Sequence, residues 1–332
     1  MAGEKSMKIV ITAPFDSEQV EKLRSQHEVL FLPQDDSTPL RSEEQLHTLL
    51  ETEDAEIFIT ESDRVTAGVL EGLKSLKLIG VCRAGLNDID TSACTARGVA
   101  LINTPGRNAA AVADVVVALF INLSRFLFAG EKLLRSGQWD EGLYYRLRGH
   151  ELQGRTAAFI GFGAIPRELV KRLKGFDMRL AAYDPYITGD VMESYGVEKV
   201  TLEDAFRRGD YVTVHLPVTD ETRHMIGRDL LGLMKPTAYF VNAARAAVTV
   251  EEDVLDLLEE HRIAGAAFDV FEQEPLSPDS RFMKLDNTIL IPHLGGASLD
   301  VVKNHSRMIA GDIERCLKGE TPLHLVNPAV LT

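Results

Sequence analysis

The chain has 332 residues, of which 45% are hydrophobic, and that length exceeds what a single hydrophobic core usually serves. We therefore expect two folded domains and exclude a disordered or fibrous protein. Acidic residues outnumber Lys and Arg by 50 to 36, which gives a formal net charge of −14. Because this charge repels the phosphate backbone of nucleic acids, we expect no nucleic-acid partner.

The cysteines and the apolar stretches limit where the protein works. Cys82, Cys94 and Cys316 are too few and too scattered for a disulfide framework or a zinc site, so we expect reduced thiols, no metal and a cytoplasmic location. The N-terminal residues contain no signal-peptide core. The apolar stretch Val112–Phe128 carries one Asp and one Arg, so no membrane span is expected.

Short β-rich stretches alternate with helical patterns along the chain, which predicts doubly wound α/β domains with parallel sheets. The first part of the chain contains five predicted strands: Lys8–Ile11, Val29–Leu32, Ile57–Thr60, Leu78–Val81 and Ala100–Asn103. Amphipathic helices are expected between them at Ser17–Ser25 and Ser42–Glu51, with Ser42 as an N-cap. These elements form one small α/β unit.

A second unit is expected after Thr104-Pro105-Gly106, where a long helix is predicted from Ala109 to Arg135. Six strands follow at the spacing of a complete dinucleotide-binding sheet: Thr156–Ile160, Arg179–Tyr183, Tyr211–Val214, Ala238–Val241, Ile263–Ala267 and Thr288–Ile291. The last helix, Ser298–Lys318, is expected to cross back and cover the first unit. The predicted domains are residues 1–104 with 299–332, and residues 105–298.

The stretch from Gly161 to Pro166 follows a predicted strand and opens a helix. In a dinucleotide site the first glycine makes a tight turn, and the second, here Gly163, lets the backbone approach a pyrophosphate at the helix N-terminus. Pro166 stands where the fingerprint has its third glycine, and proline is tolerated in a first helical turn. An ordinary strand–helix turn has the same pattern, so the motif alone leaves both interpretations open.

Asp184 ends the next predicted strand, about 20 residues downstream, where an acid can accept hydrogen bonds from both ribose hydroxyls. An acid at this place disfavours a 2′-phosphate, and its neighbours Pro185 and Tyr186 supply no arginine to bind one. The pattern therefore favours NAD over NADP. The alternative is a surface aspartate before a proline turn.

Three segments with polar residues come directly after predicted strands: Asn242 to Arg245, Phe268 to Pro275, and Ile291 to Gly296. Ligands bind at the carboxyl ends of strands in open α/β sheets. A single arginine, glutamate or histidine there is more often a surface or capping residue. Arg245, Glu274 and His293 at equivalent strand ends instead indicate a catalytic site.

These segments resemble the D-isomer-specific 2-hydroxyacid dehydrogenase family. The resemblance covers nearly the whole chain and extends to Arg83-Ala84-Gly85 through Asp90, Asn103 to Asn108, the Gly161 loop and His215-Leu216-Pro217. It implies a Rossmann NAD-binding domain inserted in a flavodoxin-like substrate domain, NAD as cofactor, and a small 2-hydroxy or 2-keto acid of D configuration as substrate.

The resemblance also implies roles for individual residues. Arg245, Glu274 and His293 would be catalytic, and Arg83, Ala84 and Gly85 would bind the substrate together with Arg245, the last two through backbone amides to its carboxylate. The residues implied for the cofactor are Gly161, Gly163, Ala164, Ile165, Asp184, His215, Pro217, Ala243, Asp269, Gly295 and Gly296.

The chemistry explains why these residue types are needed. Reduction of a 2-keto acid requires a proton on the carbonyl oxygen as hydride reaches the carbon, and His293 is a suitable donor near neutral pH. Glu274 would orient the imidazole and favour its protonated form. Arg245, always charged and fork-shaped, can hold the carboxylate and polarise the carbonyl.

Three departures from the family pattern affect the expected cofactor affinity and pocket shape: Pro166 for the third glycine, Ala246 for the glycine after the arginine, and Thr249 where an aspartate is common. The substrate identity is left open. The loops Arg83–Asp90 and Thr60–Arg64 are expected to shape the pocket.

Two other functions remain possible on the same fold. One is an NADH-sensing, corepressor-like binding protein. We expect no disordered tail for recruiting partners, which counts against this function. We also do not expect the extra regulatory domain of longer phosphoglycerate dehydrogenases. The other is a hydrolase or isomerase that keeps NAD bound.

Apolar residues surround the helix around Val115–Phe128, and aromatic residues follow at Trp139, Tyr144 and Tyr145. This predicts a homodimer through this region, with burial inside one chain as the alternative.

Overall fold

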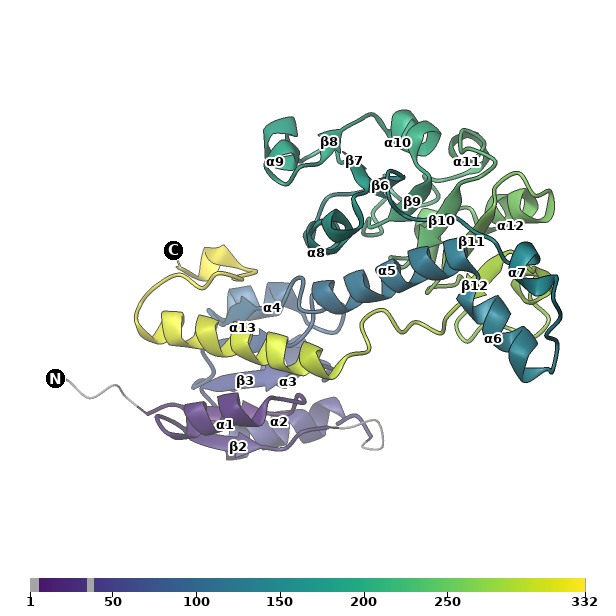
Figure 1. Cartoon of the computed structure of the whole chain (residues 1–332). Helices are drawn as coiled ribbons and strands as arrows, with labels where there is room; N and C mark the ends of the chain where they lie inside the picture. Colours follow the sequence, from purple (N-terminus) through teal and green to yellow (C-terminus); the bar gives the residue numbers. More distant parts are fainter. Residues whose placement is uncertain (1–5, 35–38, 332) are drawn as a thin grey trace. The chain divides into compact units, whose positions relative to one another are not determined.

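The computed structural model describes residues 6–34 and 39–331, which fold into two compact α/β units (Figure 1). Unit 1 comprises residues 1–107 and 298–332, and unit 2 comprises residues 108–297. These limits lie within three residues of the boundaries derived from the sequence. The second unit is thus inserted between two segments of the first.

Unit 1 contains a five-stranded sheet in which all described strand pairs are parallel and the order is β2-β1-β3-β4-β5. This is the flavodoxin-like order, so the expected fold of this unit is confirmed. The strands are β1 (Lys8–Ile11), β2 (Glu28–Phe31), β3 (Ile57–Thr60), β4 (Leu78–Val81) and β5 (Ala100–Ile102). The helices are α1 (Ser17–Arg24), α2 (Glu43–Thr52), α3 (Ala67–Leu70), α4 (Thr91–Ala96) and α13 (Leu299–Leu317).

Local sequence signals explain the helix ends in this unit. Ser42 caps α2 with a reciprocal capping box to Gln45, as its position before two acids predicts. Helix α13 begins after Ser298, which caps it, and its Ile309 and Ile313 join the buried core beneath β1, β3 and β4. Figure 1 shows α13 beside α1, on the unit that contains the N-terminal strands. The expectation that the last helix covers the first unit is therefore confirmed.

Unit 2 contains a seven-stranded parallel sheet in the described residues, with the order β12-β11-β10-β9-β6-β7-β8. The strands are β6 (Thr156–Ile160), β7 (Arg179–Tyr183), β8 (Glu198–Lys199), β9 (Tyr211–Val214), β10 (Tyr239–Asn242), β11 (Gly265–Phe268) and β12 (Thr288–Leu290). The run from β8 to β11 has the Rossmann order, and β12 extends it. The prediction of six strands was wrong in omitting β8, whose two residues carry no strand pattern of their own.

The helices of unit 2 are α5 (Ala109–Arg125), α6 (Leu127–Arg135), α7 (Leu143–Arg146), α8 (Ala164–Leu173), α9 (Gly189–Ser194), α10 (Leu202–Arg208), α11 (Arg228–Leu231) and α12 (Glu251–Glu259). Helices of this unit contribute to two separate buried cores, α5 and α8 to one and α10, α11 and α12 to the other. Helix α5 packs against α8, and its Val116, Leu119 and Phe120 belong to the same buried core as Phe159 of β6.

The predicted single helix from Ala109 to Arg135 was wrong, because it breaks at Phe126 and bends by 67° between α5 and α6. Phe126 has a left-handed backbone conformation with φ of 54°. The Asn122 side chain accepts a hydrogen bond from the Phe128 N–H at 3.0 Å and so satisfies a donor at the start of α6. Within residues 6–34 and 39–331, no single helix is long and apolar enough to cross a membrane, although the bent pair α5 and α6 would pass that test together.

Candidate active site

The glycine loop between β6 and α8 has the geometry of an anion-binding turn. Gly161 has φ of +97°, and a Cβ at this residue would lie 2.8 Å from the carbonyl oxygen of His215. Gly163 is the N-cap of α8, has open space around it, and no side chain caps the helix. The backbone N–H groups of Ala164 and Ile165, at the start of α8, are therefore available to a phosphate.

Pro166 is the third residue of α8 and is buried. It lies in the first turn, where a backbone N–H has no intrahelical partner, so its missing donor does not break the helix. The departure from the third glycine is therefore compatible with the observed start of α8.

Asp184 follows β7 and is tied to the glycine loop by its own carboxylate. One oxygen accepts a hydrogen bond from the N–H of Phe162 at 2.8 Å, and the other accepts from Tyr186 at 2.8 Å and Ile187 at 3.1 Å. These three contacts fix the carboxylate beside the glycine loop. That Asp184 accepts hydrogen bonds from both ribose hydroxyls stays a prediction from the sequence.

His215 follows β9 and lies beneath the glycine loop. Its Nε2 shares a hydrogen bond with Thr213 Oγ1 at 3.0 Å, and its Nδ1 is buried without a hydrogen-bond partner among the described residues. Burial lowers the pKa of His215 to about 3, so the ring is neutral at physiological pH. Because the N–H of a neutral imidazole is not acidic at that pH, His215 is unsuited to act as a general acid. Pro217, two residues on, is exposed, and its carbonyl accepts from Thr222.

The three residues expected to be catalytic follow neighbouring strands. Arg245 comes after β10, Glu274 after β11 and His293 after β12, and parallel strands bring their carboxyl ends to one edge of the sheet. His293 Nδ1 lies 2.9 Å from Glu274 Oε2, in hydrogen-bond contact. Both side chains are partly exposed, and Arg245 is exposed. The structure therefore brings Glu274 and His293 together, at the edge where Arg245 also lies.

Electrostatics at this edge keep Glu274 ionised. Burial pushes its pKa upward, but hydrogen bonds from His293 and from the Phe271 N–H, together with the positive charges of His293 and Arg245, outweigh burial and leave the pKa below its usual value. An ionised Glu274 holds the Nδ1 side of the imidazole, which leaves Nε2 as the ring nitrogen that can serve a substrate.

Asp269 anchors the backbone of the histidine loop. Its two carboxylate oxygens accept from the N–H groups of Leu294 at 2.5 Å and Gly295 at 2.8 Å. A Cβ at Gly295 would lie 2.6 Å from Asp269 Oδ2, so only glycine permits this contact. Burial raises the pKa of Asp269, although these two hydrogen bonds oppose the shift. His293 itself has φ of 53°, which a non-glycine residue rarely adopts, and the Asp269 contacts hold the residues that follow it.

Two further residues expected at the cofactor site, Ala243 and Gly296, lie in the segments that follow β10 and β12. Ala243 is buried directly after β10, and the neighbouring Ala244 N–H donates to Asn242 Oδ1 at 3.1 Å. Gly296 lies against Asn108, whose Nδ2 would be 2.9 Å from an added Cβ. Thr249, which replaces an aspartate of the family pattern, is buried and donates its hydroxyl to the Ala246 carbonyl at 2.9 Å. Ala246 and Thr249, the two departures from the family pattern in this segment, thus form a local turn after Arg245.

The residues expected to bind the substrate carboxylate belong to unit 1, after β4. Arg83 Nη2 donates to Ser62 Oγ at 3.1 Å, and the Ala84 carbonyl accepts from Asn103 Nδ2 at 2.8 Å. Gly85 has open space around its Cα. Their backbone N–H groups are thus placed on an exposed loop of this unit.

The structure joins three residues of unit 1 to which no individual role was assigned from the sequence: Glu61, within the loop expected to shape the pocket, Arg107 and His305. A faint signal existed for His305, because it lies four residues from both Val301 and Ile309 on the buried face of α13. A polar residue on such a face needs a buried partner. No group of three or more His, Cys, Asp or Glu side chains in the described chain could hold a metal ion.

Comparison with known proteins agrees with this geometry. Residues 117–295 match the family of the D-isomer specific 2-hydroxyacid dehydrogenase, NAD binding domain. A glyoxylate reductase of Thermofilum pendens is 38% identical over 272 residues, which cover 81% of this chain and 80% of the relative. A D-3-phosphoglycerate dehydrogenase of Methanocaldococcus jannaschii is 36% identical over 97% of this chain, which spans 59% of that longer relative.

Among solved structures, a 2-hydroxyacid dehydrogenase from Ketogulonicigenium vulgare Y25 superposes with a TM-score of 0.77 at 28% identity, covering 98% of this chain and 99% of that one. The likeness extends over both units, and the family match covers more than half of the chain. The glycine loop, the uncapped start of α8 and Asp184 fit the NAD cofactor of this family. The chain therefore belongs to the D-isomer specific 2-hydroxyacid dehydrogenase family, whose members are NAD-binding oxidoreductases that transfer hydride.

Proposed function

We propose that this protein interconverts a small 2-keto acid and the corresponding D-2-hydroxy acid with NAD(H). The observation that carries the proposal is the hydrogen bond between His293 and Glu274 at the sheet edge where Arg245 also lies. The names of the two relatives, a glyoxylate reductase and a D-3-phosphoglycerate dehydrogenase, support an acid substrate of this class.

Each residue has a distinct part in the reduction. NADH, when bound, supplies the hydride. Protonated His293 gives the proton on Nε2 to the carbonyl oxygen, while Glu274 on the Nδ1 side orients the ring and stabilises the imidazolium. Arg245 binds the carboxylate and polarises the carbonyl, and Arg83 with the backbone amides of Ala84 and Gly85 supplies further donors for the carboxylate.

The residues proposed to bind the cofactor are those of the glycine loop, Asp184, the His215 and Pro217 segment, Ala243, Asp269 and the Gly295-Gly296 turn. Asp184 carries negative charge beside the loop and would repel a 2′-phosphate, which supports NAD over NADP. The cytoplasmic location stays a prediction from the cysteine count; Cys82 and Cys94 are buried free thiols.

The proposal is tested by following NADH oxidation with a panel of 2-keto acids, from glyoxylate to phosphorylated and sugar-derived acids. We expect turnover with at least one of them. His293→Ala and Arg245→Ala should each lower kcat by about 10²–10⁴-fold while NADH still binds, as measured by its fluorescence.

His261→Ala is the matched control, because His261 is an exposed residue of unit 2 with φ of 50°, close to that of His293. It should keep wild-type turnover. NADH binding without turnover of any acid would instead favour the NADH-sensing, corepressor-like function, and near wild-type kcat in His293→Ala would remove that residue from the mechanism.

A further inference from the structure

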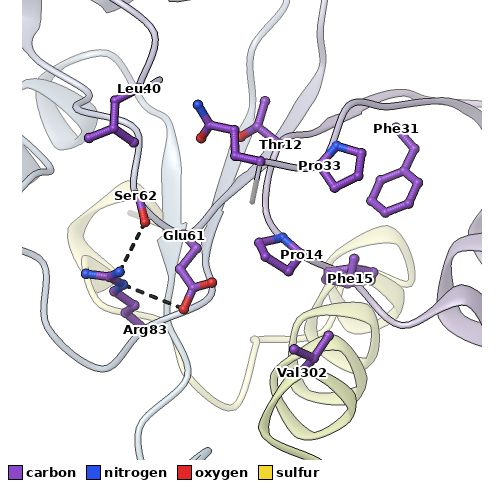
Figure 2. A pocket seen from close by; sticks show the side chains of 11 residues that line it. Thr12, Pro14, Phe15, Phe31, Pro33, Leu40, Glu61, Ser62, Arg83 and Val302 are labelled. Atoms are coloured by element: carbon purple, nitrogen blue, oxygen red, sulfur yellow. Dashed lines mark hydrogen bonds and ion pairs between the residues drawn. The ribbon is translucent and has the colours of Figure 1, made fainter. Parts of the chain in front are cut away.

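Unit 1 contains a cavity of about 830 Å³ at the carboxyl ends of β1, β2, β3 and β4 (Figure 2). Its size lies within the range of small-molecule sites, which is about 300–1,000 Å³. Six of its lining residues are apolar: Pro14, Phe15, Phe31, Pro33, Leu40 and Val302. Arg83, which directly precedes the Ala84-Gly85 amides proposed for the substrate carboxylate, also lines it. The cavity therefore adjoins the loop that the proposed function assigns to the substrate.

Two charged side chains line this cavity among the described residues, Glu61 and Arg83, and they face each other. Arg83 Nε lies 3.7 Å from Glu61 Oε1, and Arg83 Nη2 donates to Ser62 Oγ, as the dashed lines in Figure 2 show. Among the described lining residues, these two opposite charges are paired with each other. An anionic group entering the cavity would have to compete with Glu61 for Arg83.

Glu61 is also bound by a second arginine, Arg107, which restrains its side chain. Arg107 Nη2 donates to Glu61 Oε1 at 2.6 Å, and Arg107 Nη1 donates to His305 Nδ1 at 2.7 Å. His305 Nε2–H donates in turn to the Pro14 carbonyl at 2.8 Å. Burial lowers the pKa of His305, which keeps the ring neutral and able to accept from Arg107. Both ends of the Arg107 guanidinium are therefore engaged within this network.

Resting on the proposed function, we propose that Glu61 determines specificity: it makes the cavity select 2-keto acids with an extended, uncharged tail over those whose tail carries phosphate or a second carboxylate. An extended apolar tail removes surface of Phe31 and Leu40 from water without disturbing the ion pair. A charged tail finds no free cation there, because Glu61 already pairs with both Arg83 and Arg107, so the tail must displace Glu61 from Arg83. Similarity to a phosphoglycerate dehydrogenase thus does not carry over to a phosphorylated substrate.

The first test compares kcat/KM in NADH oxidation for four acids: pyruvate, 4-methyl-2-oxopentanoate, 2-oxoglutarate and 3-phosphohydroxypyruvate. We expect 4-methyl-2-oxopentanoate to exceed pyruvate by about tenfold or more, because its branched tail fills apolar space. It should exceed the two acids with charged tails by about tenfold or more as well. A preference for pyruvate or for either charged-tail acid would overturn the proposal while leaving the proposed function intact.

The second test changes the charge of residue 61. In Glu61→Gln, the ratio of kcat/KM for 3-phosphohydroxypyruvate to that for 4-methyl-2-oxopentanoate should rise about tenfold or more, because Arg83 is released to an anionic tail. Glu61→Asp retains the charge and should keep the ratio near the wild-type value. An unchanged ratio in Glu61→Gln, or an equal rise in Glu61→Asp, would overturn the assignment to charge.

Glu71→Gln is the matched control, because Glu71 is an exposed glutamate of the same unit. It should leave turnover and the ratio unchanged. Thermal unfolding of each variant, compared with wild type, identifies loss of folding, and a ratio of two substrates on one enzyme is independent of the fraction folded. If none of the four acids is reduced and the wider panel is also inactive, the proposed function fails, which differs from failure of the selectivity alone.

Discussion

His293 Nδ1 and Glu274 Oε2 form a hydrogen bond that is an ion pair only when the imidazole is protonated. The pKa of Glu274 lies below its usual value, so this carboxylate stays charged through the neutral range. In the proposed reduction, its negative charge lies beside the ring that gives up the proton. The pH dependence of turnover therefore reports on this contact.

Glu274→Gln keeps the size of the side chain and removes its charge. Without the carboxylate the imidazolium loses its proton at lower pH, so the falling limb of keto acid reduction should move to lower pH. The measurement is kcat for reduction across the pH range, with Glu272→Gln on the same loop as control. An unchanged profile would show that Glu274 has a structural part only.

Asp184 is the residue expected to separate NAD from NADP. Asp184→Ala removes the negative charge beside the Phe162 N–H, and the preference for NADH over NADPH should therefore narrow. The ratio of kcat/KM for the two cofactors measures this, and Asp190→Asn, an exposed acid nearby in the chain, should leave it unchanged. Equal use of both cofactors by the unmutated protein would contradict the assignment.

Among the structural elements, the turn from β6 into α8 depends most on a single residue. Gly161→Ala should destabilise the protein by about 1–3 kcal/mol, because an L side chain is strained at φ of +97° and its Cβ would meet the His215 carbonyl. Urea unfolding measures the free energy of unfolding, and NADH affinity should weaken as well.

Gly175→Ala serves as the control for that change, because its added Cβ has open space and its φ is not positive. A loss of stability in Gly161→Ala no larger than in Gly175→Ala would mean that the loop adapts to a side chain.

For the helices and strands, regular sequence patterns predicted most elements, whereas irregular features such as the helix break at Phe126 were missed. Short apolar stretches located eleven strands within about two residues, because strands buried on both faces of a parallel sheet have nearly continuous hydrophobic sequences. The break at Phe126 was missed because apolar residues continue across it and no Gly or Pro marks it. Its left-handed backbone and the Asn122 cap become visible only once the chain is folded.

The candidate site shows the same division. Arg245, Glu274 and His293 follow strands, so the topology of a parallel sheet sufficed to predict their common edge. The link from Glu61 through Arg107 to His305 joins residues 46 and 198 positions apart, and it depends on side-chain packing that no local pattern encodes. The three hydrogen bonds that hold the Asp184 carboxylate likewise depend on backbone N–H directions in the turn.

For the whole molecule, we propose a homodimer formed mainly through α6 and the segment that follows it. Val116, Leu119 and Phe120 of α5 are buried in the core of unit 2, so these residues are used within one chain. By contrast α6 has no buried residue, and Phe128, Trp139 and Tyr144 are 59%, 78% and 75% exposed. Large exposed aromatic side chains are typical of interfaces between subunits.

Light scattering coupled to size exclusion should give about twice the chain mass of 36.7 kDa over a wide concentration range. Phe128→Glu should shift the protein toward monomer, because a charge would be buried at the interface, whereas Glu131→Gln on the same helix should not. A fully active monomer at all concentrations would contradict the dimer.

The insertion of unit 2 within unit 1 also orders events during synthesis on the ribosome. Residues 108–297 are contiguous, so unit 2 has its complete sheet available before α13 is made. Unit 1 is different, because Ile309 and Ile313 pack against β1, β3 and β4, which are made well before the whole of unit 2, and Asn327 bonds the backbone of Leu101 in β5 and of Val99 before it. The nascent β1 to β5 sheet therefore has one face only partly covered, by α1, while a whole domain is translated, and chaperones would encounter the apolar surface that α13 later covers.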